Sequence, residues 1–183
     1  MKINQTGAHL DHMLRQTRMH HVQLSAMADA KANALMTMSA VITTFSASFV
    51  AKPNFQPAVI VLMSFSLLTI ILATLAVMPK TPLRIRRQPR PTAPPSSPGY
   101  NLLFFGTFVT MDYEQFEAAM EETMNDHSKT YEVAVREIYG LGYFLAAKKY
   151  RYLRFAYMSF LTGVLLAGLV LVVTNVGPFK ISH

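Results

Sequence analysis

Basic and aromatic side chains are interleaved in the segment that precedes the last apolar stretch of the chain. Arg136, Tyr139 and Tyr143 fall on adjacent turns of one predicted helix. Lys149 and Arg151 follow in the same helical pattern. An arginine offers a bidentate fork to a phosphate, and a tyrosine ring stacks on a nucleobase. This spacing favours a site for a phosphate-bearing ligand, whereas the plainer interpretation is a belt of Lys, Arg and Tyr at a membrane interface.

The other polar clusters are weaker candidates for chemistry. His20 and His21 are adjacent, so on a helix they point in different directions and do not converge on a metal ion. Glu117 and Glu121 lie four residues apart, which is typical of a solvated helix face. The sequence has no cysteine, no Gly-rich phosphate loop and no Gly-x-Ser-x-Gly or His-Glu-x-x-His motif. We therefore predict a protein that is not an enzyme, with no catalytic residue, metal or cofactor.

Three apolar stretches must position these groups, and they cover residues 34–50, 58–78 and 155–176. About 20 apolar residues cross a hydrocarbon core, and the second and third stretches meet this length without a charge. The first is shorter and needs Lys31 and Lys52 to snorkel toward the two surfaces; the alternative for it is a buried hairpin helix. We predict an all-α membrane protein with three transmembrane helices and a small helical cytoplasmic module between spans two and three.

The charges are distributed unequally between the two sides that these spans create. Of the 17 Lys and Arg residues, all but Lys52 and Lys180 precede the first stretch or lie between the second and third. The positive-inside rule then predicts a bacterial inner-membrane protein with a cytoplasmic N-terminus. The net charge of +7 is explained by this bias, so we predict a lipid bilayer and not a nucleic acid as the partner.

The predicted organisation alternates cytoplasmic, membrane and external parts. Residues 79–99 are rich in proline and arginine and are predicted to be a tether along the inner leaflet. The parts in order are a cytoplasmic N-terminal helix at 1–31, transmembrane helix 1 at 32–51, an external turn at 52–57, transmembrane helix 2 at 58–78, the tether at 79–99, a cytoplasmic helical sensor module at 100–154, transmembrane helix 3 at 155–176 and an external tail at 177–183.

Small and hydroxyl-bearing side chains within the spans predict helix association. Ser159, Gly163 and Ala167 recur every four residues, which lets helix backbones approach. Two opposite faces of the first stretch carry hydroxyl groups, which fits either a helix packed between neighbours or a pore lining. One of these faces contains Thr37, Thr44 and Ser48, and the other contains Ser39, Thr43 and Ser46. No charge lies deep in a span, which disfavours an ion-coupled transporter.

Several segments together resemble a known family. These are residues 21–32, with Ala-Asp-Ala-Lys-Ala before the first span, and residues 101–108, with Leu-Leu-Phe-Phe-Gly. Residues 137–142, which read Glu-Ile-Tyr-Gly-Leu-Gly, and residues 149–154 complete the set. The chain from about His21 to Gly168 resembles the transmembrane effectors of Pycsar anti-phage systems, the PycTM family. Glu137 stands where aspartate is more usual in that family.

The resemblance implies a function and a ligand. In such systems a partner cyclase makes cyclic UMP or cyclic CMP, and the effector senses it and impairs the inner membrane, so that infection is aborted. We then expect the phosphate to pair with Arg136 or with Lys149 and Arg151. The base is expected to stack on tyrosine or phenylalanine rings, and a homo-oligomer is expected to act on the membrane. The candidate rings are those of Tyr139, Tyr143, Phe104 and Phe105.

Other functions compete with this one. The main alternative is a membrane-anchored scaffold or regulator that binds a protein partner through its cytoplasmic helices and needs no nucleotide. An enzyme acting on inner-leaflet lipid, and a toxin that permeabilises the membrane without any ligand, are further alternatives. A cyclase gene beside this one distinguishes the effector from the scaffold.

Overall fold

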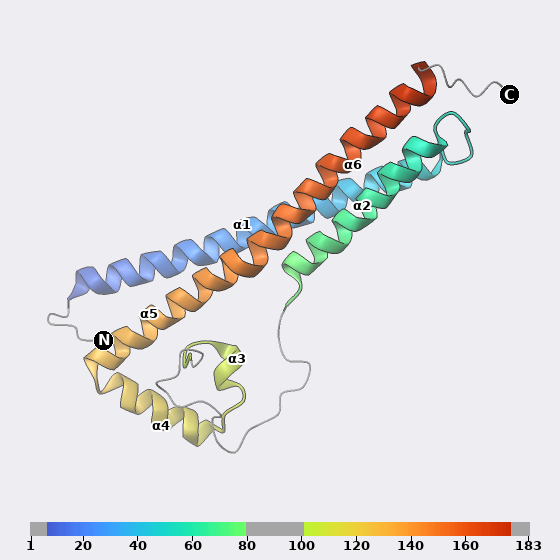
Figure 1. The fold of residues 1–183 in the computed structure, drawn as a ribbon. Coiled ribbons are helices and arrows are strands. Elements are labelled where there is room, and N and C mark those ends of the chain that lie inside the picture. The colour runs from blue at the N-terminus through green and yellow to red at the C-terminus, as the bar shows by residue number, and fades with distance from the viewer. Residues whose placement is uncertain (1–6, 80–100, 177–183) are drawn as a thin grey trace. The chain divides into compact units, whose positions relative to one another are not determined.

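The computed structural model describes residues 7–79 and 101–176, and every regular element in these ranges is helical, as expected (Figure 1). The predicted tether and C-terminal tail lie outside the described residues, except for Pro79. The helices are α1 (Ala8–Ala47), α2 (Gln56–Val77), α3 (Phe105–Phe108), α4 (Tyr113–Met124), α5 (His127–Phe144), the π-helix η1 (Leu145–Lys149) and α6 (Tyr150–Val176).

Two helical stretches among the described residues are long and apolar enough to cross a membrane. They are Gln56–Val77 and the run His127–Asn175, whose apolar part is the third predicted span. The first predicted span forms the second half of α1, and α1 is not one of these two helices. Serine and threonine residues alternate with its apolar ones, which lowers its hydropathy. The prediction of three spans is therefore kept as a proposal.

The chain divides into two compact units. Unit 1 comprises Met1–Leu24 and Pro79–Leu145, and unit 2 comprises Ser25–Met78 and Ala146–His183. Helix α1 contributes its first part to unit 1 and its second part to unit 2. The helical run through α5, η1 and α6 is divided in the same way, within η1.

Unit 2 is built from the second part of α1, together with α2 and α6. Most residues of its buried core are alanines, so the three helix backbones approach closely. The core consists of Ala28, Ala32, Leu35, Ala73, Ala76, Leu153 and Ala156. Large apolar side chains such as Phe45, Ile71 and Leu165 are instead more than half exposed. A bundle with small residues inside and large apolar ones outside suits lipid surroundings.

The contact between α2 and α6 is tight in the middle of the bundle. The hydroxyl oxygens of Thr69 and Ser159 are 3.2 Å apart, and the Ser159 hydroxyl also donates to the Phe65 carbonyl oxygen at 3.3 Å. Gly163 lies against Phe65 so closely that a Cβ at this position would collide with the Phe65 side chain. Gly163 is therefore required for the close approach of the two helices.

Unit 1 contains the first part of α1 with α3, α4 and α5. Asp126 caps α5 by accepting hydrogen bonds from the backbone N–H groups of Ser128 and Lys129, at 2.9 and 3.4 Å. A small apolar core holds the segment before α4 against α4 and α5. Its buried members are Leu102 and Met111, and Phe108, Phe116, Ala119, Met120 and Val133 pack on them.

Candidate functional site

Two exposed tyrosines form a stacked pair on α5. Tyr139 and Tyr143 are 72% and 61% exposed, and their ring centroids are 6.3 Å apart at an interplanar angle of 22°. The four-residue spacing places both rings on the same side of the helix, one turn apart. Large aromatic rings are ordinarily covered, so this pair presents an aromatic surface to solvent in unit 1.

Arg136 lies one turn before Tyr139 on the same helix. Its Nη2 donates to Glu132 Oε1 at 2.9 Å, and its side chain is 22% exposed. A guanidinium group carries five N–H donors in a rigid fork, and this contact uses one nitrogen of that fork. The structure therefore keeps the predicted grouping of Arg136, Tyr139 and Tyr143 within one face of α5.

The Leu-Leu-Phe-Phe-Gly segment begins beside α5. The Asn101 amide nitrogen lies 3.9 Å from the position that a Cβ on Gly140 would occupy, so this segment starts next to the tyrosine pair. The rings of Phe104 and Phe105 are 4.8 Å apart and about half exposed. Phe104 and Phe105 belong to unit 1, like the tyrosines, and they form a second exposed aromatic pair there.

Lys149 and Arg151 belong to unit 2, whereas the tyrosine pair belongs to unit 1. The Lys149 side chain is only 8% exposed, and its ammonium is 2.7 Å from the Ser25 hydroxyl and 2.7 Å from the Asp29 carboxylate. The Arg151 guanidinium is 6.0 Å from the centroid of the Phe155 ring. Sequence reasoning offered these two cations as the alternative to Arg136 for pairing with a phosphate. The structure surrounds Lys149 with partners, and the assignment of Lys149 and Arg151 to a ligand site stays a prediction.

Polar contacts between α1 and α5 support the tyrosine-bearing helix inside unit 1. The Arg18 guanidinium is 3.1 Å from Glu137, whose side chain is 14% exposed. The Tyr131 hydroxyl donates to Asp11 at 2.7 Å, and this hydrogen bond raises the pKa of Tyr131 above its ordinary value. The His21 ring packs 3.2 Å from where a Cβ on Gly142 would lie, so a larger residue there would press on this ring.

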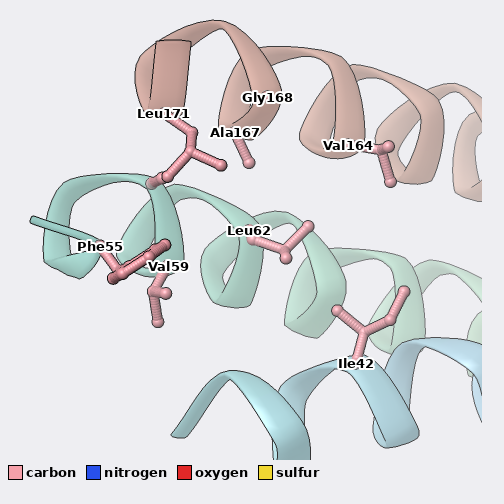
Figure 2. Close-up of a pocket in the computed structure, with 9 residues that line it drawn as sticks. Ile42, Phe55, Val59, Leu62, Val164, Ala167, Gly168 and Leu171 are labelled. Atoms are coloured by element: carbon pink, nitrogen blue, oxygen red, sulfur yellow. The ribbon is translucent and has the colours of Figure 1, made fainter. Parts of the chain in front are cut away.

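A cavity of about 320 Å³ lies in unit 2 between α1, α2 and α6 (Figure 2). Its lining is apolar and includes Ile42, Phe55 and Leu62, with Gly168 leaving open space on α6. A phosphate needs donors or cations, and this cavity offers neither. The cavity is therefore unsuited to a nucleotide.

The residues predicted for helix packing lie on two different kinds of surface. Ser159 and Ala167 are buried, and together with Gly163 they lie on the side of α6 that faces α2. Thr37 and Thr44 are exposed on the side of α1 opposite its buried face, and Ser48 is exposed just after the end of this helix. The Thr37 and Thr44 hydroxyls bond to carbonyl oxygens four residues earlier in α1. Packing of that face against a neighbouring helix, or its use as a pore lining, remains a prediction.

Sequence reasoning missed Ser25, Asp29 and Arg18 as partners of residues far along the chain. Asp29 carried a signal, because it is the only acidic residue between Asp11 and Asp112. An acidic side chain among alanines, next to an apolar stretch, calls for a partner. No local pattern identifies Lys149 as that partner, because about 120 residues separate the two.

These features define an all-helical protein with a lipid-adapted bundle and a separate unit that carries exposed aromatic and basic side chains. Residues 12–174 match the family model of the Pycsar effector protein domain, PycTM, and the chain belongs to this family. No curated protein and no solved structure matches the chain. Membership makes the protein a cyclic-nucleotide effector of anti-phage defence that responds to a partner cyclase, in a family that is generally non-catalytic.

Proposed function

We propose that this protein binds a cyclic pyrimidine mononucleotide, cyclic UMP or cyclic CMP, through unit 1 and then impairs the bacterial inner membrane. The single observation that carries the site assignment is the exposed, stacked Tyr139–Tyr143 pair one turn from Arg136. The family match supplies the class of ligand.

The two parts of such a ligand suit the two kinds of side chain. The planar base would stack on the tyrosine pair, with the Phe104–Phe105 pair as the second aromatic surface of the same unit. Base–aromatic stacking contributes about 1–3 kcal/mol per base. The cyclic phosphate would pair with Arg136, whose planar fork suits phosphate oxygens better than an ammonium does.

In this proposal, unit 2 is the part that impairs the membrane. Three spans, with α1 as the first, would place the N-terminus and unit 1 in the cytoplasm, where the cyclase product accumulates. To act, the nucleotide must bind the active conformation more tightly than the resting one. A homo-oligomer that uses the exposed Thr37 and Thr44 of α1, with Ser48 just after it, would then disrupt the bilayer.

Calorimetric titration of the detergent-solubilised protein with cyclic UMP, CMP, AMP and GMP tests the ligand assignment. We expect saturable binding of one pyrimidine nucleotide, and about 10-fold or greater weakening in Tyr139→Ala and Arg136→Ala variants, as lost stacking or a lost charged hydrogen bond predicts. Absence of binding by folded wild-type protein would favour the scaffold that binds a protein partner.

Two matched controls separate the site from general surface effects. Tyr113 is 73% exposed on α4 of the same unit, so Tyr113→Ala removes an equally exposed ring. Arg15 is exposed on α1 and also lies in unit 1, so Arg15→Ala removes the same charge elsewhere. Equal loss of affinity in the controls and in the site variants would show that the tyrosine pair is not the binding surface.

A further inference from the structure

A cluster of three polar side chains lies at the start of unit 2, where α1 and the η1–α6 run both enter that unit. The Lys149 ammonium is 2.7 Å from the Ser25 hydroxyl and 2.7 Å from the carboxylate of Asp29. Lys149 is 8% exposed, whereas the Asp29 side chain is 42% exposed. We name Ser25, Asp29 and Lys149 the Lys149 cluster.

Burying these polar groups in an apolar bundle costs desolvation free energy. Its neighbours on the same helices are the buried core residues Ala28, Ala32 and Leu153. Burying an ion pair in such surroundings adds little net stability, and apolar residues of similar size do as well or better. Ion pairs of this kind instead select one register over another, because a charge left without its partner is strongly disfavoured.

Lys149 is also the last residue of the π-helix Leu145–Lys149. A π-turn contains one residue more than an α-turn, and such turns are rare and found mostly at functional sites. The separation between the two ion pairs also differs by one residue between the two helical runs. Eleven residues separate Arg18 from Asp29 on α1, whereas twelve separate their partners Glu137 and Lys149. The π-turn accommodates the additional residue.

We propose that the Lys149 cluster holds α6 in its resting register on α1, and that separation of Lys149 from Asp29, with conversion of the π-turn to an α-turn, is the step that activates unit 2. The Asp29 side chain is 42% exposed, although its Oδ1 atom is buried, so water can reach the side chain when the lysine leaves and the pair can separate. Conversion of the turn rotates α6 about its own axis by about 100°, one residue of an α-helix. This inference rests on the proposed function for the signal that triggers it.

The test is dye release from liposomes that contain the purified full-length protein, with and without cyclic UMP or cyclic CMP. The Asp29→Asn/Lys149→Met double variant removes both charges together, so neither is left buried alone. We expect it to release dye without nucleotide about 10-fold faster than wild type, within the ordinary range of coupling between two states. Lys148→Met removes a neighbouring exposed lysine and should leave the nucleotide-free rate unchanged.

The charge-swapped variant Asp29→Lys/Lys149→Asp restores the ion pair with the two charges exchanged. Without nucleotide, it should release dye as slowly as wild type. The proposal would be overturned if the double variant releases dye only when nucleotide is added, as wild type does, because the pair would then be structural only. The proposal would also be overturned if the charge-swapped variant releases dye without nucleotide, since any change at these positions would then activate unit 2. If a variant does not fold, shown by lost helix content, the other variant decides.

Failure of the proposed function is distinguishable from failure of this inference. Calorimetric binding of nucleotide by the wild type reports on the ligand site in unit 1. Nucleotide-free leakage of the double variant reports on the Lys149 cluster alone. If the double variant leaks dye but the wild type binds no nucleotide, the role of the Lys149 cluster is supported and the ligand assignment is refuted.

Discussion

Individual side chains in unit 1 connect α1 to α5 through contacts that depend on protonation. The Tyr131 hydroxyl donates to the Asp11 carboxylate at 2.7 Å, and this raises the pKa of Tyr131 above 10.0. Ionisation of the phenol would remove the donor and place a negative charge beside the carboxylate. The contact therefore stabilises the folded unit only while the tyrosine is neutral.

This linkage predicts a loss of stability at alkaline pH. Because the pKa is higher in the folded state, the contribution of Tyr131 is complete below about pH 10 and is lost as pH rises through the folded-state pKa. We expect the midpoint temperature of wild type to fall more steeply above that pH than the midpoint of Tyr131→Phe. Tyr113→Phe, an exposed tyrosine, should follow the wild-type profile. Identical profiles for all three proteins would contradict the role of this hydrogen bond.

Two glycines of α6 predict opposite responses to the same substitution. A Cβ at Gly163 would collide with Phe65, whereas a Cβ at Gly168 has nothing within 4 Å. Gly163→Ala should therefore destabilise unit 2 by about 1–3 kcal/mol, the usual effect of overpacking. Gly168→Ala should be neutral or stabilising, because alanine favours the helix. Thermal unfolding in detergent measures the stability of both variants. Equal midpoint temperatures would show that α2 moves at Phe65 to accommodate the added methyl group.

At the scale of elements, the continuity of two helical runs through both units is the main feature. Helix α1 is unbroken from Ala8 to Ala47, and α5, η1 and α6 follow one another without a gap. The sequence of both runs is compatible with uninterrupted helices, because neither contains proline. It did not predict the π-turn, which adapts one helix to the contacts that it makes with another.

Deletion of Ala146, an exposed residue inside η1, tests the π-turn itself. The deletion should convert η1 to an ordinary α-helix and leave eleven residues between Glu137 and Lys149, the same separation as between Arg18 and Asp29 on α1, so that both ion pairs are kept. We expect unchanged helix content by circular dichroism and a midpoint temperature no lower than that of wild type. Ala146→Gln alters the same position without altering the register and should behave as wild type. A deletion variant with a lower midpoint temperature would show that the π-turn does not accommodate an additional residue.

For the whole molecule, the number of spans decides where unit 1 is located. The chain contains no cysteine, so single cysteines report topology without background. We expect a membrane-impermeant maleimide to label Asn54→Cys in intact cells but to leave His12→Cys and Glu117→Cys unlabelled until the membrane is opened. If α1 does not cross, His12→Cys would be labelled from outside like Asn54→Cys. All three positions are exposed, so lack of labelling reports the side of the membrane.

The sequence by itself determined the features that depend on local pattern and on composition. Apolar stretches, charge bias and the absence of breakers are properties of neighbouring residues, so they predicted the helical class and the grouping of Arg136, Tyr139 and Tyr143. The family resemblance was confirmed by the match over residues 12–174. The three-span topology, the domain limits and the nucleotide site remain predictions.

Only the tertiary structure decided which distant residues meet. The sequence offered Lys149 as a candidate ligand residue but gave no sign of its neighbours, and packing placed it against Asp29 and Ser25. Two polar faces of α1 looked equivalent, and the bundle buried the one with Ser39 and Ser46 and left the one with Thr37 and Thr44 exposed. The physical reason is that a partner about 120 residues away is chosen by the register and rotation of whole helices, which no local pattern encodes.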